Sequence, residues 1–533
     1  MVPGRSPPGS PEPAWKSEPN LLTFILRRIV ASFFILIGAT FIAYVLVSNA
    51  GDPLENARGL PNPTQRLQTM ATITQTLHLD VNPVFRYFIW LKGVGGCFVG
   101  KCDFGVNIAQ VPVNGQLSLA LGSSLKLITA STVLAVFLGI AIGIITALRQ
   151  YSGLDYTVTL ITFLFFSLPV IWIGIVLKDI FALQFNTFLQ RGAQMSWATI
   201  IIASVLIGLI AYSLFAGELR RRLMTGALSG LVAFAVFYFI TVQQWLLNPS
   251  LGPVVIALLG VGLALGVTVL TSGLGNRKSL YTALTTVAVG VALWYPLQFF
   301  FHNGMSGWKL FGLLVIALIV GSVIGYLYGG DDRGLSARNG AITAFTTSFV
   351  IFVDRMFRAW HSYNTNTAIN GRPIRTLGPS TPNLQGDFWI QLTDTMTHLI
   401  LPTITLMLIS LATHSRFSRA SMLEVMNMDY IRTARSKGLT ERTVVMRHAL
   451  RNALIPMATV VAFDIAGLIG GAVLTETVFG WKSMGQLFQQ GLLAHDPNPV
   501  MAFFVVSATI AVLANLLADL AYAGLDPRIR VGS

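Results

Sequence analysis

Apolar runs long enough to cross a membrane follow one another along most of the chain. A helix needs about 20 apolar residues to cross the hydrocarbon core of a bilayer. The first part of the chain has such runs at 29–47, 125–148 and 157–183, and the last part has them at 398–426, 455–474 and 500–522. The pattern predicts an all-α polytopic membrane protein with six spans in these two parts. Pro169 lies inside the third run and predicts a kink there.

Residues 190–385, between these two parts, are also mostly apolar. Further candidate spans lie at 197–216, 224–246, 252–270, 280–301 and 310–327, with a weaker candidate at 341–353. A segment that leaves and re-enters the membrane on one side needs an even number of crossings, and the basic connections alternate with nearly uncharged ones. We therefore predict an inserted bundle of about six further spans. The alternative is four crossings plus surface helices. The polar residues 355–385 are expected outside.

Composition excludes a soluble globular protein. Of 533 residues, 53% are hydrophobic and only 11% are charged, and the mean hydropathy is +0.67. The formal net charge is +14. The basic residues cluster beside the spans, as cytoplasmic loops of membrane proteins do. Nucleic acid is therefore not needed to explain the charge, and membrane lipid is the expected surrounding.

The two ends of the first span set the expected topology. Residues 1–20 are rich in Pro, Ser and Gly and are predicted to be a disordered tail. Arg27 and Arg28 precede the first span and place the N-terminus in the cytoplasm. Residues 51–120 then form an outer loop, which holds the only cysteines of the chain, Cys97 and Cys102. A disulfide is plausible on that side, and two free thiols are the alternative.

A polar stretch at 428–456 lies between two apolar runs. Its basic residues outnumber its two acidic residues, Asp429 and Glu441. Apolar positions recur at helical spacing on both sides of Gly438, namely Tyr430, Ile431 and Ala434 before it and Val444, Val445, Ala449 and Leu450 after it. The pattern predicts two short amphipathic helices joined at a glycine, forming a surface that docks in the cytoplasm. The alternative is an ordinary basic loop.

The order of residues in this stretch resembles the cytoplasmic loop of bacterial ABC-importer permeases. Thr433-Ala434-Arg435 stands for the conserved triplet of that loop, Gly438 for its glycine, and Leu454-Ile455-Pro456 for its end. The run DYIRTARSKGL with RHALRNALIP is most similar to the peptide branch (dipeptide, oligopeptide, nickel). The triplet lacks the usual acidic residue and the gap from glycine to proline is longer, and the peptide branch shares both departures.

Other motifs resemble the same branch. They include Gly51-Asp52-Pro53, the run HLDVNPVFRYFIWLKG with CDFG, SLPVIW at 167–172, HLILP with SRFSRASMLEVM, GGAVLTETVFGWKSMG at 470–485, and DLAYAGLDPRIR at 519–530. The resemblance stops near residue 190 and returns near 386. The expected organisation is a tail at 1–20, a first permease half at 21–189, an insert at 190–385 and a second half at 386–533, with the coupling loop at 424–456.

The resemblance implies one B-type permease subunit of a peptide importer in the bacterial inner membrane, with both termini in the cytoplasm. It also implies a second homologous permease, two ATP-hydrolysing subunits, an extracytoplasmic substrate-binding protein and a peptide substrate. The chain itself has no phosphate-binding loop and no hydrolase or zinc-protease motif, so we expect no enzyme activity and no cofactor or metal in it. The residues expected to contact an ATPase subunit are Asp429, Tyr430, Thr433, Ala434, Arg435, Lys437, Gly438, Glu441 and Arg442.

One charged residue interrupts the fifth span. Asp464 falls in its middle, where a charge is costly unless it faces water or a partner. It is a candidate for lining the translocation path, and the alternative is a structural hydrogen bond to a neighbouring helix. A secondary transporter driven by an ion gradient is the alternative function, with Asp464 as its ion site. A membrane scaffold is a third.

Overall fold

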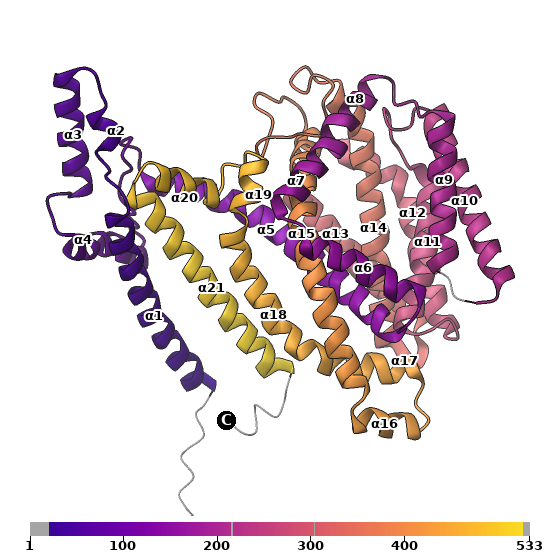
Figure 1. Cartoon of the computed structure of the whole chain (residues 1–533). Coiled ribbons are helices and arrows are strands. Elements are labelled where there is room, and N and C mark those ends of the chain that lie inside the picture. The colour runs from indigo at the N-terminus through magenta and orange to yellow at the C-terminus, as the bar shows by residue number, and fades with distance from the viewer. Residues whose placement is uncertain (1–20, 215–216, 303, 526–533) are drawn as a thin grey trace, which may run out of the picture. The chain divides into compact units, whose positions relative to one another are not determined.

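The computed structural model describes residues 21–214, 217–302 and 304–525. The predicted tail at 1–20 and the arginines at 528 and 530 lie outside the described residues. Within the described part the secondary structure is helical, apart from one isolated β-bridge between Val106 and Pro112. The predicted all-α class is therefore confirmed (Figure 1).

Membrane-spanning helices dominate the described part of the chain, where 11 helices are long and apolar enough to cross a membrane. All six predicted helices of the insert are among them. The weak candidate at 341–353 is part of a much longer helix, α14 (Arg333–Asn364), which extends into the polar segment 355–385 that is expected outside. Several side chains of α18 (Leu450–Gly471), over the predicted fifth span, lie outside the described set, and α18 is not among the eleven.

Contacts divide the chain into two compact units. The first comprises residues 1–173 and 402–533, and the second comprises 174–401. The predicted boundaries of the insert at 190 and 385 stay a prediction. Two helices run across the division: α7 (Val170–Lys178) and α15 (Phe388–Met426).

The first unit contains most of the helices that the permease resemblance covers. Its other helices are α1 (Leu21–Asn49), α2 (Glu55–Arg58), α3 (Pro63–Leu77), α4 (Pro83–Gly95), η1 (Gly96–Val99), α5 (Val113–Leu148), α6 (Gly153–Ser167), α16 (Asp429–Ser436), α17 (Glu441–Thr443), η4 (Val444–Ala449), α18, α19 (Val473–Val478), α20 (Met484–Leu493) and α21 (Pro497–Leu525). An aromatic and aliphatic core joins α1, α4, α5, α20 and α21, with Tyr44, Tyr87, Met484 and Met501 at most 2% exposed.

The second unit is a bundle of antiparallel helices. Its other helices are η2 (Asp179–Gln184), α8 (Phe185–Gln190), α9 (Trp197–Leu214), α10 (Leu219–Val242), α11 (Gly252–Thr271), α12 (Arg277–His302), α13 (Gly307–Tyr328), η3 (Gly330–Asp332) and α14. Its main core surrounds Trp389, which is 1% exposed and donates its indole N–H to the Phe301 carbonyl at 2.9 Å.

The predicted third span is broken and not merely kinked. Leu168 follows α6 in an extended conformation, with ψ of 136°, and α7 begins at Val170. Pro169 explains the break, because its ring disfavours the helical conformation of the residue before it. The helical segment at 170–190, including the π-helical turn η2, is long enough to span by itself.

The loop between α1 and α5 is helical and fixed to α1. The hydroxyl of Tyr87 on α4 donates to the Ile37 carbonyl at 3.1 Å and lies 2.9 Å from the Thr40 hydroxyl. Burial raises the pKa of Tyr87 above its ordinary value. Cys97 and Cys102 are joined in a disulfide, with 4.1 Å between their Cα atoms, and their bridge closes the turn after α4.

A buried carboxylate holds the second unit together. Asp354 on α14 is fully buried and accepts hydrogen bonds from the backbone N–H groups of Leu251 and Gly252, at 2.8 and 3.1 Å. The same side chain accepts from the Trp294 indole at 2.9 Å and from Arg358 at 3.1 Å. The carboxylate therefore joins the start of α11 to α12 and α14. In hydrocarbon each of these donors would otherwise lack a hydrogen-bond acceptor.

Replacing this carboxylate tests its structural role. We expect Asp354→Ala to lower the free energy of unfolding by about 3 kcal/mol, because several buried donors lose their acceptor. Loss of helical circular dichroism during denaturation in detergent measures the change. Asp80→Ala removes an exposed carboxylate and is the matched control. Equal stability of the two variants would contradict the structural role.

Candidate functional site

The polar stretch after α15 starts with a helix whose underside is apolar. Ile431 and Ala434 on α16 are 0% and 6% exposed, whereas Tyr430, Thr433 and Arg435 face outward. The buried pair joins an apolar cluster with side chains from the ends of α5 and α15 and from the segment after α16. Burying an isoleucine contributes about 2 kcal/mol. The helix α16 is thus packed onto the spans and does not hang free.

A glycine turn follows α16, as the sequence predicts. Lys437 ends the helix, and Gly438 has a φ of +75°, a conformation that favours glycine. A Cβ added at Gly438 would meet no atom within 4 Å. No described neighbour would clash with a side chain at this position, so only the backbone conformation favours a glycine here. Thr440 then starts α17, accepting from the Thr443 N–H at 3.4 Å.

An ion pair spans the glycine turn. Nε of Arg435 lies 2.8 Å from Oε1 of Glu441, and a second guanidinium nitrogen lies 3.4 Å from Oε2. The side chains of Arg435 and Glu441 are 40% and 66% exposed, so the pair contributes little to stability. Its two-pronged geometry still fixes the orientation of α16 relative to α17.

The second predicted helix of the stretch is not separate. The helices α17, η4 and α18 follow one another without interruption, from Glu441 to Gly471. The prediction of a second short helix is wrong because no helix-breaking residue follows Thr440 before Pro456, and α18 continues through this proline. The turn η4 is π-helical, a local widening that often occurs at functional sites. Asn452 on α18 donates to the Tyr430 hydroxyl at 2.8 Å and ties α16 to the span.

The outward surface of this stretch is strongly basic. Asp429 lies 3.5 Å from Arg432, and Glu441 pairs with Arg435. Among the described residues, no ion pair is formed by the remaining cations of the stretch, which are Lys437, Arg442, Arg447 and Arg451. These positive charges follow α16 along the stretch and can bind an acidic or polar partner.

Asp464 lies against the neighbouring span. Its carboxylate accepts from the Ser410 hydroxyl at 3.1 Å and lies 3.0 Å from Nε2 of His414, both on α15. The side chain of His414 is fully buried, and that of Asp464 is 19% exposed. These contacts match the alternative that Asp464 makes a structural hydrogen bond to a neighbouring helix. Because its side chain is partly exposed, the carboxylate also stays accessible. Its assignment to the translocation path therefore stays a prediction.

Two buried acidic side chains of the segment between α18 and α21 were not predicted to have a role. Glu476 on α19 accepts from the Ser124 hydroxyl of α5 and from the Gly485 N–H, both at 2.8 Å, and burial raises its pKa. Asp496 accepts from the backbone N–H groups of Ile108 and Asn498, at 2.6 and 3.2 Å. The position of Glu476 in the motif GGAVLTETVFGWKSMG was the only signal, because the partners lie far away in sequence.

Comparison with known proteins gives consistent matches. The family described as binding-protein-dependent transport system inner membrane component matches residues 371–531. The oligopeptide transport system permease protein OppB of Mycobacterium bovis is 40% identical over 224 residues, which are 41% of this chain and 69% of the relative.

Two further relatives match over a shorter part. The oligopeptide permease AppB of Bacillus subtilis is 45% identical over 136 residues, 26% of this chain and 43% of the relative. The dipeptide permease DppB of Escherichia coli is 47% identical over 137 residues, 26% of this chain and 40% of the relative.

Asp496 makes stability depend on pH. Burial raises its pKa from 3.8 to about 6, against the lowering effect of its two hydrogen bonds. The folded protein therefore binds this proton more tightly than the unfolded chain. Protonation of Asp496 therefore stabilises the folded protein most at low pH, and this contribution is lost as the pH rises through about 6.

We expect wild type to gain about 1.4 kcal/mol relative to Asp496→Asn when the pH falls from about 8 to about 5. Thermal unfolding in detergent at both pH values measures this difference. All other titrating groups are common to both proteins, so equal pH dependence of the two would contradict the expectation.

Proposed function

The chain belongs to the binding-protein-dependent transport system inner membrane components, and from this premise we propose that it is a permease subunit of an ATP-driven peptide importer. Its relatives are named as oligopeptide and dipeptide permeases. The proposed setting is the bacterial inner membrane, with both termini in the cytoplasm. The proposed partners are a second homologous permease, two ATP-hydrolysing subunits and an extracytoplasmic substrate-binding protein.

The observation that carries the proposal is the two-sided construction of α16. One side is apolar and packs on the spans, with Ile431 fully buried. The other side is polar and basic, and none of the described residues covers it. A surface of this kind can bind a partner subunit and pass its movement to the spans, because the contacts on the inner side are close-packed.

Movement would pass along two routes. The helix α16 follows α15 directly, and α17 leads through η4 into α18. The pair Arg435–Glu441 and the bond between Asn452 and Tyr430 hold these parts in one arrangement. We propose that closure of the ATPase subunits shifts this surface as a rigid body and so changes the tilt of α15 and α18. The transport step is then a shift between two conformations, driven by ATP hydrolysis outside this chain.

We do not favour a secondary transporter driven by an ion gradient. Asp464, its candidate ion ligand, already has Ser410 and His414 as partners. The family membership also supports a permease subunit whose transport is driven by separate ATP-hydrolysing subunits. A peptide substrate would meet the exposed part of Asp464 through its amino group.

The proposal can be tested by purifying the tagged protein in mild detergent and identifying the proteins that accompany it. We expect two ATP-binding subunits and a second permease, together with ATPase activity. Reconstituted vesicles containing this complex should take up labelled peptides when the binding protein and ATP are supplied. A protein that purifies alone, with uptake that follows a proton or sodium gradient, would overturn the proposal.

Bulk at the glycine turn should uncouple ATP hydrolysis from transport. We expect Gly438→Trp to lower peptide uptake per ATP hydrolysed about tenfold or more, equivalent to losing about 1.4 kcal/mol of contact with the ATPase subunit. Uptake and ATPase rates are measured on the same vesicles.

Two control variants separate contact from strain. Gly438→Ala has the same backbone strain but little bulk. Gly100→Trp adds the same bulk at a glycine with a φ of +76° that also has no neighbour within 4 Å of an added Cβ. Both should remain coupled, and normal coupling of Gly438→Trp would rule out a close contact there.

Asp464 is tested by removing its charge. If it lines the path, Asp464→Asn should reduce uptake about tenfold at an unchanged amount of assembled complex, because a hydrogen bond to a charged group contributes about 1.5 kcal/mol or more. Ser410→Ala, which removes one hydrogen bond but keeps the charge, should transport normally. Unchanged uptake by Asp464→Asn would remove the residue from the pathway.

A further inference from the structure

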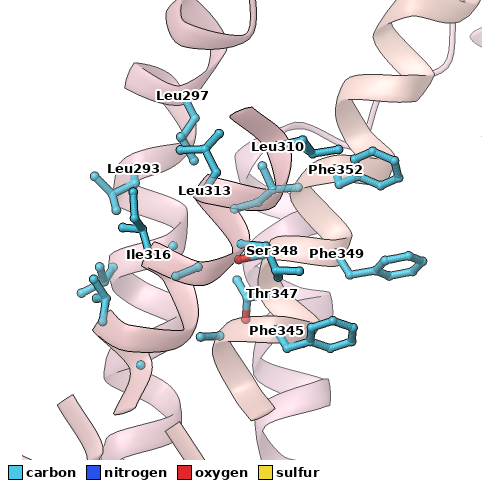
Figure 2. Close-up of a pocket in the computed structure, with 18 of the residues that line it drawn as sticks. Leu293, Leu297, Leu310, Leu313, Ile316, Phe345, Thr347, Ser348, Phe349 and Phe352 are labelled. Carbon is cyan, nitrogen blue, oxygen red and sulfur yellow. The ribbon is translucent and has the colours of Figure 1, made fainter. Parts of the chain in front are cut away.

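The second unit contains an elongated apolar cavity between α12, α13 and α14. Its volume is about 460 Å³. Figure 2 shows leucines of α12 and α13 and phenylalanines of α14 around it, with Thr347 and Ser348 of α14 among them. Its lining on α13 extends from Gly307 to Ile324, about 25 Å along the helix. The cavity is therefore narrow and runs along the direction of the spans.

A close contact between α13 and α14 closes one end of the cavity. A Cβ at Gly325 would lie 2.2 Å from the Ser336 carbonyl oxygen, and one at Gly321 would lie 2.5 Å from that of Gly340. Small residues thus let the two backbones touch there. The cavity starts beside this contact, at Gly321, Ile324 and Ala344, and continues toward Leu310 and Phe352.

The lining excludes ions and strongly polar ligands. It contains no charged residue, and its only side-chain polar groups are the hydroxyls of Thr286, Thr347 and Ser348. The Thr286 hydroxyl already donates to the Thr282 carbonyl at 2.8 Å. Along most of this space water would lack hydrogen-bond partners, because the Thr347 and Ser348 hydroxyls lie at one place on α14, and an empty space would leave the lining atoms without contacts. An apolar occupant avoids both costs.

The rim of the cavity indicates where this occupant comes from. Five lining residues are more than 45% exposed, namely Leu293 at 47%, Phe311 at 59%, Ile316 at 57%, Phe345 at 47% and Phe349 at 58%. They lie on membrane-spanning helices, so the medium around them is hydrocarbon. A further helix, with a diameter of about 10 Å and a length of about 25 Å, would need roughly four times the volume of the cavity.

We propose that this cavity binds one acyl chain of a membrane lipid between α12, α13 and α14. The chain enters past the phenylalanines of the rim and fills the space alongside α13. The charged headgroup stays at the membrane surface, because the lining offers it no partner. The lipid then acts as part of the packing of the second unit, independently of the transport function.

The test uses the purified full chain in nanodiscs that contain phosphatidylethanolamine with a diazirine near the end of one acyl chain. After illumination, mass spectrometry locates the adducts. We expect them to concentrate on residues such as Leu293, Leu313 and Thr347. Labelling spread evenly over all exposed faces of the spans would overturn the proposal.

Cavity-filling variants supply the control. Ala317→Phe and Val289→Phe fill the space from α13 and from α12, and each should reduce adducts in the cavity about tenfold, as expected from loss of contact with about two methylene groups. Ala198→Phe adds the same ring at an exposed site of α9 and should leave the labelling unchanged. Two filling variants on different helices guard against a folding defect in one. Undiminished cavity labelling in both would refute acyl-chain binding there.

Discussion

Buried carboxylates that accept backbone hydrogen bonds fix the loops and helix ends of this protein in place. A helix satisfies its own backbone in hydrocarbon, but a loop or a helix end does not. At several places a buried Asp or Glu accepts from the free N–H groups of such a segment. The acceptors are Asp155 for Tyr151, Asp354 for Leu251 and Gly252, Asp394 for Thr381, Glu476 for Gly485, and Asp496 for Ile108. Each burial cost is offset by hydrogen bonds that fix a loop in one position.

These carboxylates also mark the limit of what the sequence predicts. Apolar runs predicted helices of membrane-spanning length, including six between residues 190 and 385, because a bilayer imposes a length that can be counted. The glycine turn at 438 followed from local rules as well. No local rule pairs Asp496 with Ile108 or Glu476 with Ser124, since those contacts join distant segments. Sequence reasoning found the motif around Glu476 but not its role.

Local backbone chemistry explains the two errors of helix assignment. Pro169 breaks the third run completely, because Leu168 adopts an extended conformation before it. Pro456 does not break α18, although it is the same residue type. A π-helical turn lies just before it, at Val444–Ala449. A proline in an apolar run therefore predicts a disturbance, but the neighbouring turns decide whether it becomes a break.

The exposed basic surface of the stretch 428–456 matters because the opposite side of α16 is packed on the spans. An exposed basic loop alone could bind many partners weakly, and it would move without moving anything else. Here Ile431 and Ala434 are buried in a cluster that includes Met422 of α15 and Ala453 of α18. Moving α16 without moving these helices would open that cluster and expose apolar side chains. The free energy of keeping this cluster closed therefore links any displacement of α16 to α15 and α18.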